Sequence, residues 1–182
     1  MKNLIVSGAS RGIGRAIALK FASEGWNVAF CSRNINNLLA LEKELEVVQP
    51  EGKYLAYVCD VSNQKEVKDF AHAAIKFLGD VDILVNNAGI FLPGSVHEMA
   101  EETFTQLMGT NVTSAFTLTK EIVLGMKAKK KGHIFNMSSI AGLMAYPNGG
   151  AYNVTKHALT GYSKTLREEL KTFGVRVSTI YP

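Results

Sequence analysis

Short apolar runs alternate with longer segments of helical periodicity along the whole chain. Several of the short runs are apolar at every position, which is typical of parallel strands whose two faces are both covered. Repeated alternation of strand and helix predicts a doubly wound α/β fold, a parallel sheet between two helical layers. The expected strands are residues 4–6, 28–31, 54–59, 83–85, 133–137 and 175–180, and the expected helices are residues 13–23, 35–48, 63–77, 101–129 and 151–172.

Turn-forming pairs such as Glu24-Gly25 and Lys131-Gly132 separate these elements. No linker, low-complexity tract or repeat interrupts the pattern, so residues 1–182 are expected to form one domain. The longest helix is expected to break around Gly109. In a doubly wound sheet, ligands bind outside the carboxyl ends of the strands, near the point where the strand order reverses. Functional residues are therefore expected at those ends.

The composition is that of a folded protein, since 47% of residues are apolar, 20% are charged and the mean hydropathy is +0.06. No run approaches the roughly 18 apolar residues of a membrane span. The first strand starts by Leu4, so no signal peptide is expected. Cys31 and Cys59 are too few for a disulfide framework or a zinc site. We expect a cytoplasmic protein that contains no metal.

The formal net charge of +4 arises from one short stretch containing Lys127, Lys129, Lys130 and Lys131. Without these four lysines, 16 basic residues balance 16 acidic ones. A solvated helix end before Gly132 explains the cluster better than a surface for nucleic acid. Neither a nucleic acid nor a membrane is expected as a partner.

A glycine-rich segment directly follows the first strand and opens the first helix. Glycines permit a tight turn and let backbone N–H groups approach a pyrophosphate at the helix N-terminus. The spacing G-x-x-x-G-x-G differs from the dinucleotide fingerprint G-x-G-x-x-G, so a purely structural turn remains an alternative. The segment reads Ser7-Gly8-Ala9-Ser10-Arg11-Gly12-Ile13-Gly14.

The second strand ends at Ser32 and Arg33, where NAD-selective sites usually carry an acid for the ribose 2′-hydroxyl. A guanidinium and a hydroxyl instead suit a 2′-phosphate, and Arg11 in the glycine segment adds a second cation. This combination favours NADP(H) over NAD(H). Exposed surface arginines without a ligand remain the alternative.

Tyr152 and Lys156 lie four positions apart, and therefore on one face of the last helix. An ammonium beside a phenol favours the phenolate, which suits a tyrosine for proton transfer near neutral pH. Because a Y-x-x-x-K sequence also arises by chance, the pair needs support from other residues. Ser138 and Ser139 supply it, because they follow the fifth strand, where a hydroxyl is placed to hold a substrate carbonyl.

Amide side chains occupy the fourth strand end and the helix after it. Asn86-Asn87-Ala88-Gly89 ends the strand and Asn111 lies within the long helical segment. Buried amides at such places normally satisfy backbone groups, which remains their alternative role. The glycine segment, arginine, serine and Tyr/Lys pair nevertheless occur in the order that a hydride-transfer site requires.

Together these motifs resemble the short-chain dehydrogenase/reductase family of Rossmann-fold enzymes, including its 3-oxoacyl-[acyl-carrier-protein] reductase type. The resemblance covers residues 1–182 and includes T-G-x-x-x-G-x-G (with Ser7 for threonine), D-[VL] at Asp60-Val61, N-N-A-G and Y-x-x-x-K. It implies the strand order 3-2-1-4-5-6. It also implies that Tyr152 exchanges a proton, Ser139 orients the carbonyl, Lys156 binds the ribose and tunes Tyr152, and Asn111 holds a water. The cofactor-binding residues expected for NADP(H) are Gly8, Ser10, Arg11, Gly12, Ile13, Gly14, Ser32, Arg33, Asp60, Val61, Asn87, Ala88, Gly89, Tyr152 and Lys156.

The expected activity is reduction of a ketone to a secondary alcohol, or the reverse. A catalytically silent dinucleotide-binding or scaffold protein of the same fold is the alternative. Family members continue for roughly 50–70 residues beyond Pro182, consistent with single α/β domains of about 200–250 residues, so a final helix, strand and substrate lid are expected to be missing.

The substrate remains open between a 3-oxoacyl thioester and a general ketone or diketone. Apolar residues after the active-site motifs are candidates for a substrate pocket or for ordinary packing: Phe91, Leu92, Leu143, Met144 and Tyr146. The resemblance also implies a homodimer or homotetramer, with core packing as the alternative role of Phe104, Leu107, Phe116 and Leu118.

Overall fold

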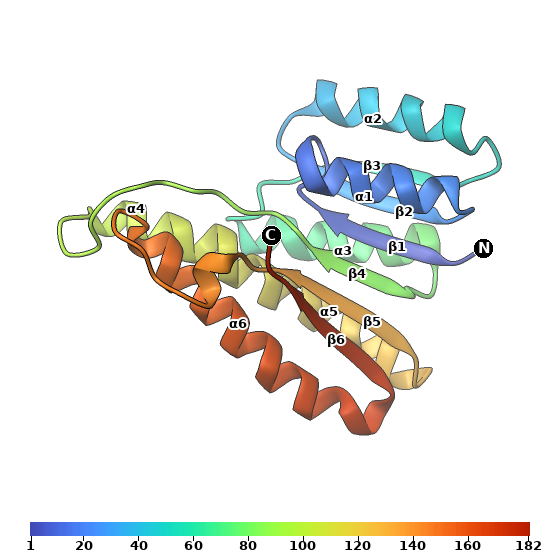
Figure 1. Cartoon of the computed structure of the whole chain (residues 1–182). Coiled ribbons are helices and arrows are strands. Elements are labelled where there is room, and N and C mark those ends of the chain that lie inside the picture. Colours follow the sequence, from blue (N-terminus) through green and yellow to red (C-terminus); the bar gives the residue numbers. More distant parts are fainter.

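A computed structural model describes all residues from Met1 to Pro182. It contains one six-stranded sheet in the order β3-β2-β1-β4-β5-β6, and every neighbouring pair is parallel (Figure 1). The doubly wound fold and the expected strand order are thus confirmed. The strands are β1 (Asn3–Ser7), β2 (Asn27–Ser32), β3 (Tyr54–Val58), β4 (Ile83–Asn86), β5 (Gly132–Met137) and β6 (Val175–Ile180).

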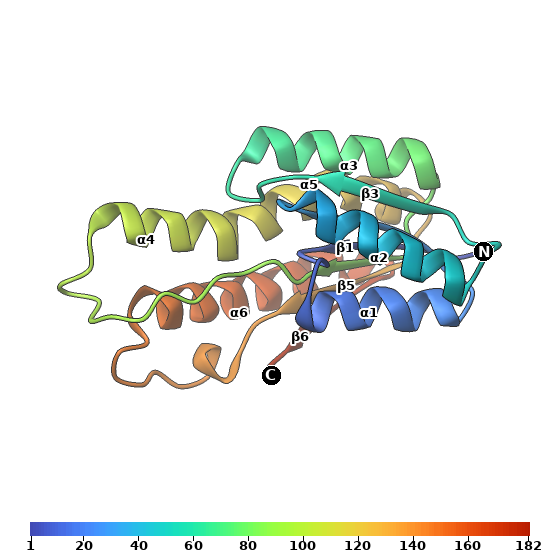
Figure 2. The same cartoon turned by 90° about the horizontal axis from the view of Figure 1, so that it is seen from above.

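Helices pack on both faces of this sheet (Figure 2). One face carries α1 and α2, and the other carries α3, α5 and α6. The helices are α1 (Gly12–Ser23), α2 (Ile35–Val48), α3 (Gln64–Leu78), α4 (Glu101–Met108), α5 (Ser114–Ala128) and α6 (Gly150–Leu170).

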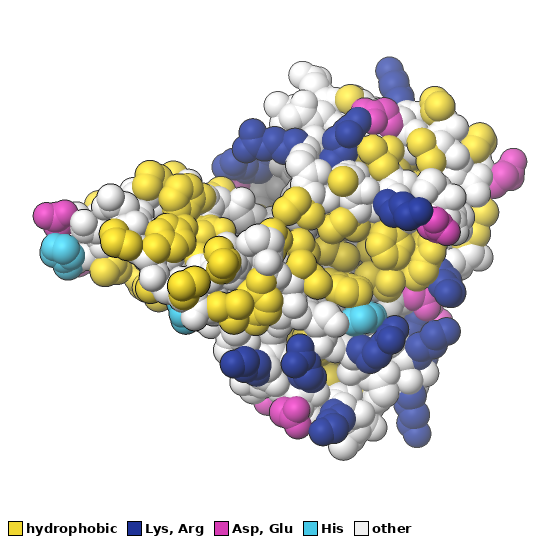
Figure 3. Space-filling model, in the orientation of Figure 1, with side chains coloured by type: hydrophobic (Ala, Val, Ile, Leu, Met, Phe, Trp, Pro, Cys, Tyr) yellow, Lys and Arg dark blue, Asp and Glu magenta, His cyan; other side chains and the backbone are white.

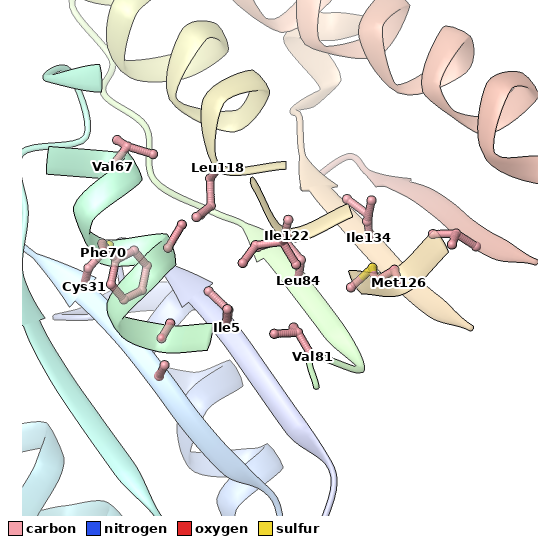
Figure 4. Close-up of a cluster of buried hydrophobic side chains, with 14 of the residues drawn as sticks. Ile5, Cys31, Val67, Phe70, Val81, Leu84, Leu118, Ile122, Met126 and Ile134 are labelled. Atoms are coloured by element: carbon pink, nitrogen blue, oxygen red, sulfur yellow. The ribbon is translucent and has the colours of Figure 1, made fainter. Parts of the chain in front are cut away.

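The central strands are buried on both faces, which explains their continuous apolar sequence. All five residues of β1 and all six of β2 are buried. Alternate side chains of one strand enter different cores, so that Ile5 packs towards α3 and α5 whereas Leu4 and Val6 pack towards α1 and α2. Figure 4 shows the first of these cores, with Phe70 of α3 and Ile122 of α5 beside the sheet.

The segment expected to be one broken helix is continuous. Between α4 and α5 the chain forms a π-helical turn over Gly109–Thr113 instead of leaving the helix. The α-helix is thus interrupted around Gly109, as expected, but the interruption is a π turn, which accommodates an extra residue without ending the helix. This turn contains Asn111, one of the expected site residues.

The lysine cluster lies where α5 ends, as expected, but two of its side chains have partners. Lys127 lies 4.0 Å from the centroid of the Phe173 ring, and Lys129 is 3.4 Å from a carboxylate oxygen of Asp82. The cluster is therefore only partly a solvated helix end. None of the helices combines the length and apolar character needed to cross a bilayer.

Candidate active site

The glycine segment is held by the end of β4. The Asn87 side-chain amide donates to the carbonyl oxygens of Ser7 and Gly8, both at 3.0 Å. The Ser7 hydroxyl oxygen accepts from the backbone N–H groups of Asn87 and Ala88, both at 3.1 Å. Gly8 has φ +68°, and a Cβ there would lie 2.8 Å from the Cα of Ala88. The Ser7 hydroxyl and the close packing of Gly8 thus fix the loop against residues 86–89, the N-N-A-G segment.

A cavity of about 540 Å³ opens above this loop at the carboxyl edge of the sheet. Figure 3 shows a hollow between the α1–α2 layer and the arm formed around α4, with Lys or Arg side chains at its rim. Its wall includes these expected cofactor residues: Gly8, Ser10, Arg11, Gly12, Ile13, Ser32, Arg33, Asp60, Val61, Asn87, Ala88 and Gly89. Gly14, Tyr152 and Lys156 are not part of the wall. Gly14 instead packs beneath the loop, where a Cβ would lie 2.5 Å from the Asn87 amide nitrogen.

The N-terminus of α1 differs from those of α2 and α3. Asn34 and Asn63 cap α2 and α3 by accepting hydrogen bonds from backbone N–H groups in the first turn. Arg11 precedes α1 and provides no side-chain cap, and no acidic residue lies in the first turn. At Gly12, which lines the cavity, no other group lies within 4 Å of the place a Cβ would take. Free N–H donors and open space at a positive helix end fit the pyrophosphate of a dinucleotide.

Arg33 and Asp60 face the same cavity from neighbouring strand ends. Partial burial raises the pKa of Asp60, but hydrogen bonds from the Ser62 amide and hydroxyl and the charge of Arg33 together bring that pKa below its usual value. Although the end of β2 lacks an acid, the fold therefore brings a carboxylate from β3 close to Arg33. This proximity was not predicted from the sequence, because it depends on strand pairing.

Five further polar residues line the cavity and were not expected from the sequence: Asn34, Asn37, Ser62, Gln106 and Thr110. Asn34 and Asn37 belong to the start of α2, whose cap signal identifies the turn but not the cavity. Gln106 and Thr110 come from α4 and the π turn across the cavity, and no sequence signal places them there.

Asn111 is 1% exposed, and its side chain makes three hydrogen bonds to protein groups. Its Oδ1 accepts from the Ile90 N–H at 2.8 Å, and its Nδ2 donates to the Ile90 carbonyl at 2.9 Å. The second Nδ2 hydrogen is donated to the Thr155 hydroxyl oxygen at 3.1 Å. Asn111 thereby joins the loop after Gly89 to α6.

Lys156 is buried beside Tyr152. Its ammonium donates to the Met137 carbonyl at 2.8 Å and lies 5.5 Å from the centroid of the Tyr152 ring. A Cβ at Gly89 would be 3.6 Å from this ammonium and 3.3 Å from the Asn111 Oδ1, so Gly89 in the cavity wall lies close to both residues. Burial lowers the pKa of Lys156 from 10.5 to about 8, because desolvation disfavours the charged form.

The two adjacent serines after β5 have different environments. The buried Ser138 hydroxyl donates to the Lys156 carbonyl at 3.1 Å and also lies 3.1 Å from the Thr160 hydroxyl. Ser139 is half-buried, and its oxygen accepts only from the Ala141 N–H, at 3.3 Å. The Ser139 O–H therefore remains free to donate, whereas the Ser138 O–H is used within the protein.

Most of the apolar candidates lie on the surface of the protein, and one of them contacts Tyr152. Phe91 packs edge-on against the Tyr152 ring, with centroids 4.9 Å apart. Phe91, Leu143, Met144 and Tyr146 are exposed and Leu92 is half-buried, so these residues do not form an enclosed pocket. Of the candidates for subunit contact, Leu107 and Leu118 are buried in the protein, whereas Phe104 and Phe116 are exposed.

Comparison with known proteins agrees with this geometry. The short chain dehydrogenase family model matches residues 2–182, and the chain belongs to that family. A protein named as ketoacyl reductase 1 of the granaticin polyketide synthase of Streptomyces violaceoruber is 37% identical over 98% of this chain. The chain spans 65% of that relative's length.

Two solved structures share the fold over the entire chain. One is a metagenomic short-chain oxidoreductase in complex with NADP, with 36% identity, a TM-score of 0.93 and 81% of its own chain covered. The other is an NAD⁺-bound xylitol dehydrogenase, with 31% identity, a TM-score of 0.93 and 69% of its chain covered. Proteins similar to this chain thus include one bound to each dinucleotide.

Proposed function

We propose that the protein is an NADP(H)-dependent oxidoreductase that reduces a ketone to a secondary alcohol, or catalyses the reverse. The observation that carries this proposal is the position of Gly89. It lies in the wall of the cavity and in contact range of both Asn111 and Lys156. A dinucleotide in the cavity therefore ends beside the group formed by Asn111, Tyr152 and Lys156. When bound, the nicotinamide cofactor supplies or accepts the hydride.

The side chains at this end have the free groups that proton transfer needs. Tyr152 donates its phenol proton to the carbonyl oxygen, since that hydroxyl makes no hydrogen bond within the protein. Ser139 donates a hydrogen bond to the same oxygen and orients it. The Lys156 ammonium uses one hydrogen on Met137, so its two others remain for ribose hydroxyls beside Tyr152. Asn111 fixes the neighbouring backbone and holds a water of the proton relay.

NADP(H) is preferred through Arg33, with Ser32 and Arg11 contributing. Arg33 and Arg11 are exposed at the cavity and neither forms an ion pair closer than 4 Å. A guanidinium binds a phosphate with a charge-assisted, often bidentate contact. The NADP complex of the similar metagenomic oxidoreductase supports this choice.

Phe91, which packs on the Tyr152 ring, favours a ketone with an apolar substituent next to the carbonyl. The name of the granaticin relative supports a ketoacyl compound as one such substrate. Exposed Phe104 and Phe116 on the α4–α5 arm favour a homodimer or homotetramer.

The test is oxidation of NADPH and NADH, followed by absorbance, with a panel of 3-oxoacyl thioesters, diketones and simple ketones. We expect turnover with NADPH at least about tenfold more efficient than with NADH. Cofactor binding without turnover across the panel would instead support a silent dinucleotide-binding or scaffold protein. Equal efficiency with both cofactors would overturn the NADP(H) assignment alone.

A further inference from the structure

Thr155 lies between two groups of the proposed site, although it has no assigned role. It is 0% exposed on α6, between Tyr152 and Lys156 in sequence. Its hydroxyl donates to the Tyr152 carbonyl at 2.8 Å and accepts from the Asn111 Nδ2 at 3.1 Å. One oxygen atom thus connects the π turn that carries Asn111 to the turn of α6 that carries Tyr152.

The hydroxyl completes the hydrogen bonding of Asn111. Ile90 satisfies the Asn111 carbonyl and one amide hydrogen, which leaves the second amide hydrogen for Thr155. A buried N–H that loses its acceptor is costly, so without this hydroxyl the amide must rotate or recruit water. Either change is transmitted to Ile90, which lines the cofactor cavity.

We propose that Thr155 is a positioning residue, whose hydroxyl sets Asn111 and Ile90 relative to Tyr152 for proton transfer. The inference rests on the proposed function and adds a residue to its machinery. Thr155 touches neither cofactor nor substrate, so its effect is on the geometry of the reacting groups. It therefore acts on kcat more than on cofactor affinity.

Two substitutions at this position separate hydrogen bonding from packing. Thr155→Val keeps the branched shape and removes the hydroxyl, whereas Thr155→Ser keeps the hydroxyl and removes a methyl group. Thr119→Val on α5 is a matched control, because Thr119 is also a buried threonine that accepts from an asparagine amide, Asn86 Nδ2, at 2.9 Å. Thr119 lies outside the cavity wall.

The experiment measures kcat, the KM and Kd for NADPH, and the side-chain amide resonances of Asn111 by nitrogen-15 NMR. These resonances are identified by their absence in Asn111→Asp. We expect Thr155→Val to lower kcat about tenfold, with KM and Kd for NADPH changed less than about twofold. Thr155→Ser should restore most of kcat, and Thr119→Val should retain it. The Asn111 amide signals should shift only in Thr155→Val.

Wild-type kcat in Thr155→Val, or an equal loss in the Val and Ser variants, would overturn the positioning role. So would Asn111 resonances that are the same in Thr155→Val and in the wild type. The absence of turnover in the wild-type protein would overturn the proposed function. The amide resonances then still decide whether the hydroxyl positions Asn111. Circular dichroism and thermal unfolding of each variant identify any variant that fails to fold. If Thr155→Val does not fold, the test is made with Thr155→Ser, which should retain the wild-type kcat and the wild-type Asn111 resonances.

Discussion

The two halves of the carboxyl edge of the sheet differ in the exposure and hydrogen bonding of their polar groups. At β1–β3 the N-terminus of α1 has no side-chain cap, and Arg11 and Arg33 are exposed to the cavity. At β4–β6 the buried polar side chains bond to one another and to the backbone, as Asn111 and Lys156 do. The first half presents exposed donors to a ligand, whereas the second half anchors its buried side chains within the protein and keeps free hydrogens on Ser139, Tyr152 and Lys156.

This difference agrees with the two roles that the proposed function gives to the halves, phosphate binding and proton transfer. A bound phosphate can replace the water that solvates exposed donors, so open groups there cost the folded protein little. Proton transfer requires fixed positions, and a closed hydrogen-bond network holds them before a substrate arrives. Substitutions in the first half should therefore alter affinity, and substitutions in the second should alter kcat or stability.

Tyr152→Phe is expected to have the largest effect. It removes the exchangeable proton and little else, so kcat should fall by at least about a hundredfold. The Kd for NADP(H), measured by titration calorimetry, should stay within about twofold of the wild type. Retention of more than about a tenth of the wild-type kcat would show that another group transfers the proton.

Lys156→Met tests the burial of a charge in the second half. The folded pKa of about 8 lies below the ordinary value of 10.5, so the unfolded chain holds more protons between these values. The free energy of unfolding of the wild type should therefore rise with pH through this window, by as much as about 3 kcal/mol.

The Lys156→Met variant should lack this rise and should equal or exceed the wild type in stability near neutral pH, because it removes a buried charge that has no acidic partner. Urea unfolding from neutral pH to about pH 10 measures the difference. Parallel pH profiles for the two proteins would mean that Lys156 titrates as an exposed lysine.

Arg33→Asp is the corresponding test in the first half. Loss of the guanidinium contact and addition of a negative charge should weaken NADP(H) binding by about 1.5–3 kcal/mol. Because Arg33 is exposed, the lower end of this range is expected at physiological salt. Affinity for NAD(H) should be unchanged or improved.

The control is Arg15→Gln, which removes a positive charge from α1 outside the cavity, where Arg15 pairs with Glu44. This control should leave both cofactor affinities unchanged. An equal effect of the two substitutions would reduce the role of Arg33 to long-range attraction.

The smallest effects should come from the helix caps. Asn63→Ala removes hydrogen bonds to the first turn of α3 and should destabilise the protein by about 1 kcal/mol without changing the affinity for NADP(H). Arg11→Ser introduces a cap at α1 and should stabilise it slightly. It should also weaken NADP(H) binding, because it removes a guanidinium from the cavity and because the new hydroxyl competes for the same N–H groups. Unfolding curves and cofactor titrations distinguish these outcomes, and unchanged cofactor affinity in Arg11→Ser would argue against a phosphate at this helix end.

Local sequence features predicted the helices and strands well where the hydrophobic periodicity and the turn-forming residues indicate the same boundaries. The helix over residues 35–48 and the strand over 175–180 have the expected boundaries. Gly109 marked the position where the long α-helix is interrupted, but this local signal did not show that the chain continues there as a π turn in contact with α6. The expected site residues came from the motifs and from the family that these motifs resemble, and their catalytic roles stay predictions.

The amino-acid sequence by itself determined the order of strands and helices and the types of group at each strand end, because both depend on short-range periodicity and on single residues. Only the tertiary structure decided which groups meet. Asp60 approaches Arg33 because β2 and β3 are paired, and Thr155 bonds to Asn111 because α6 packs on the π turn. These contacts join residues far apart in the chain, so they follow from the burial of apolar faces in a common core rather than from any local pattern.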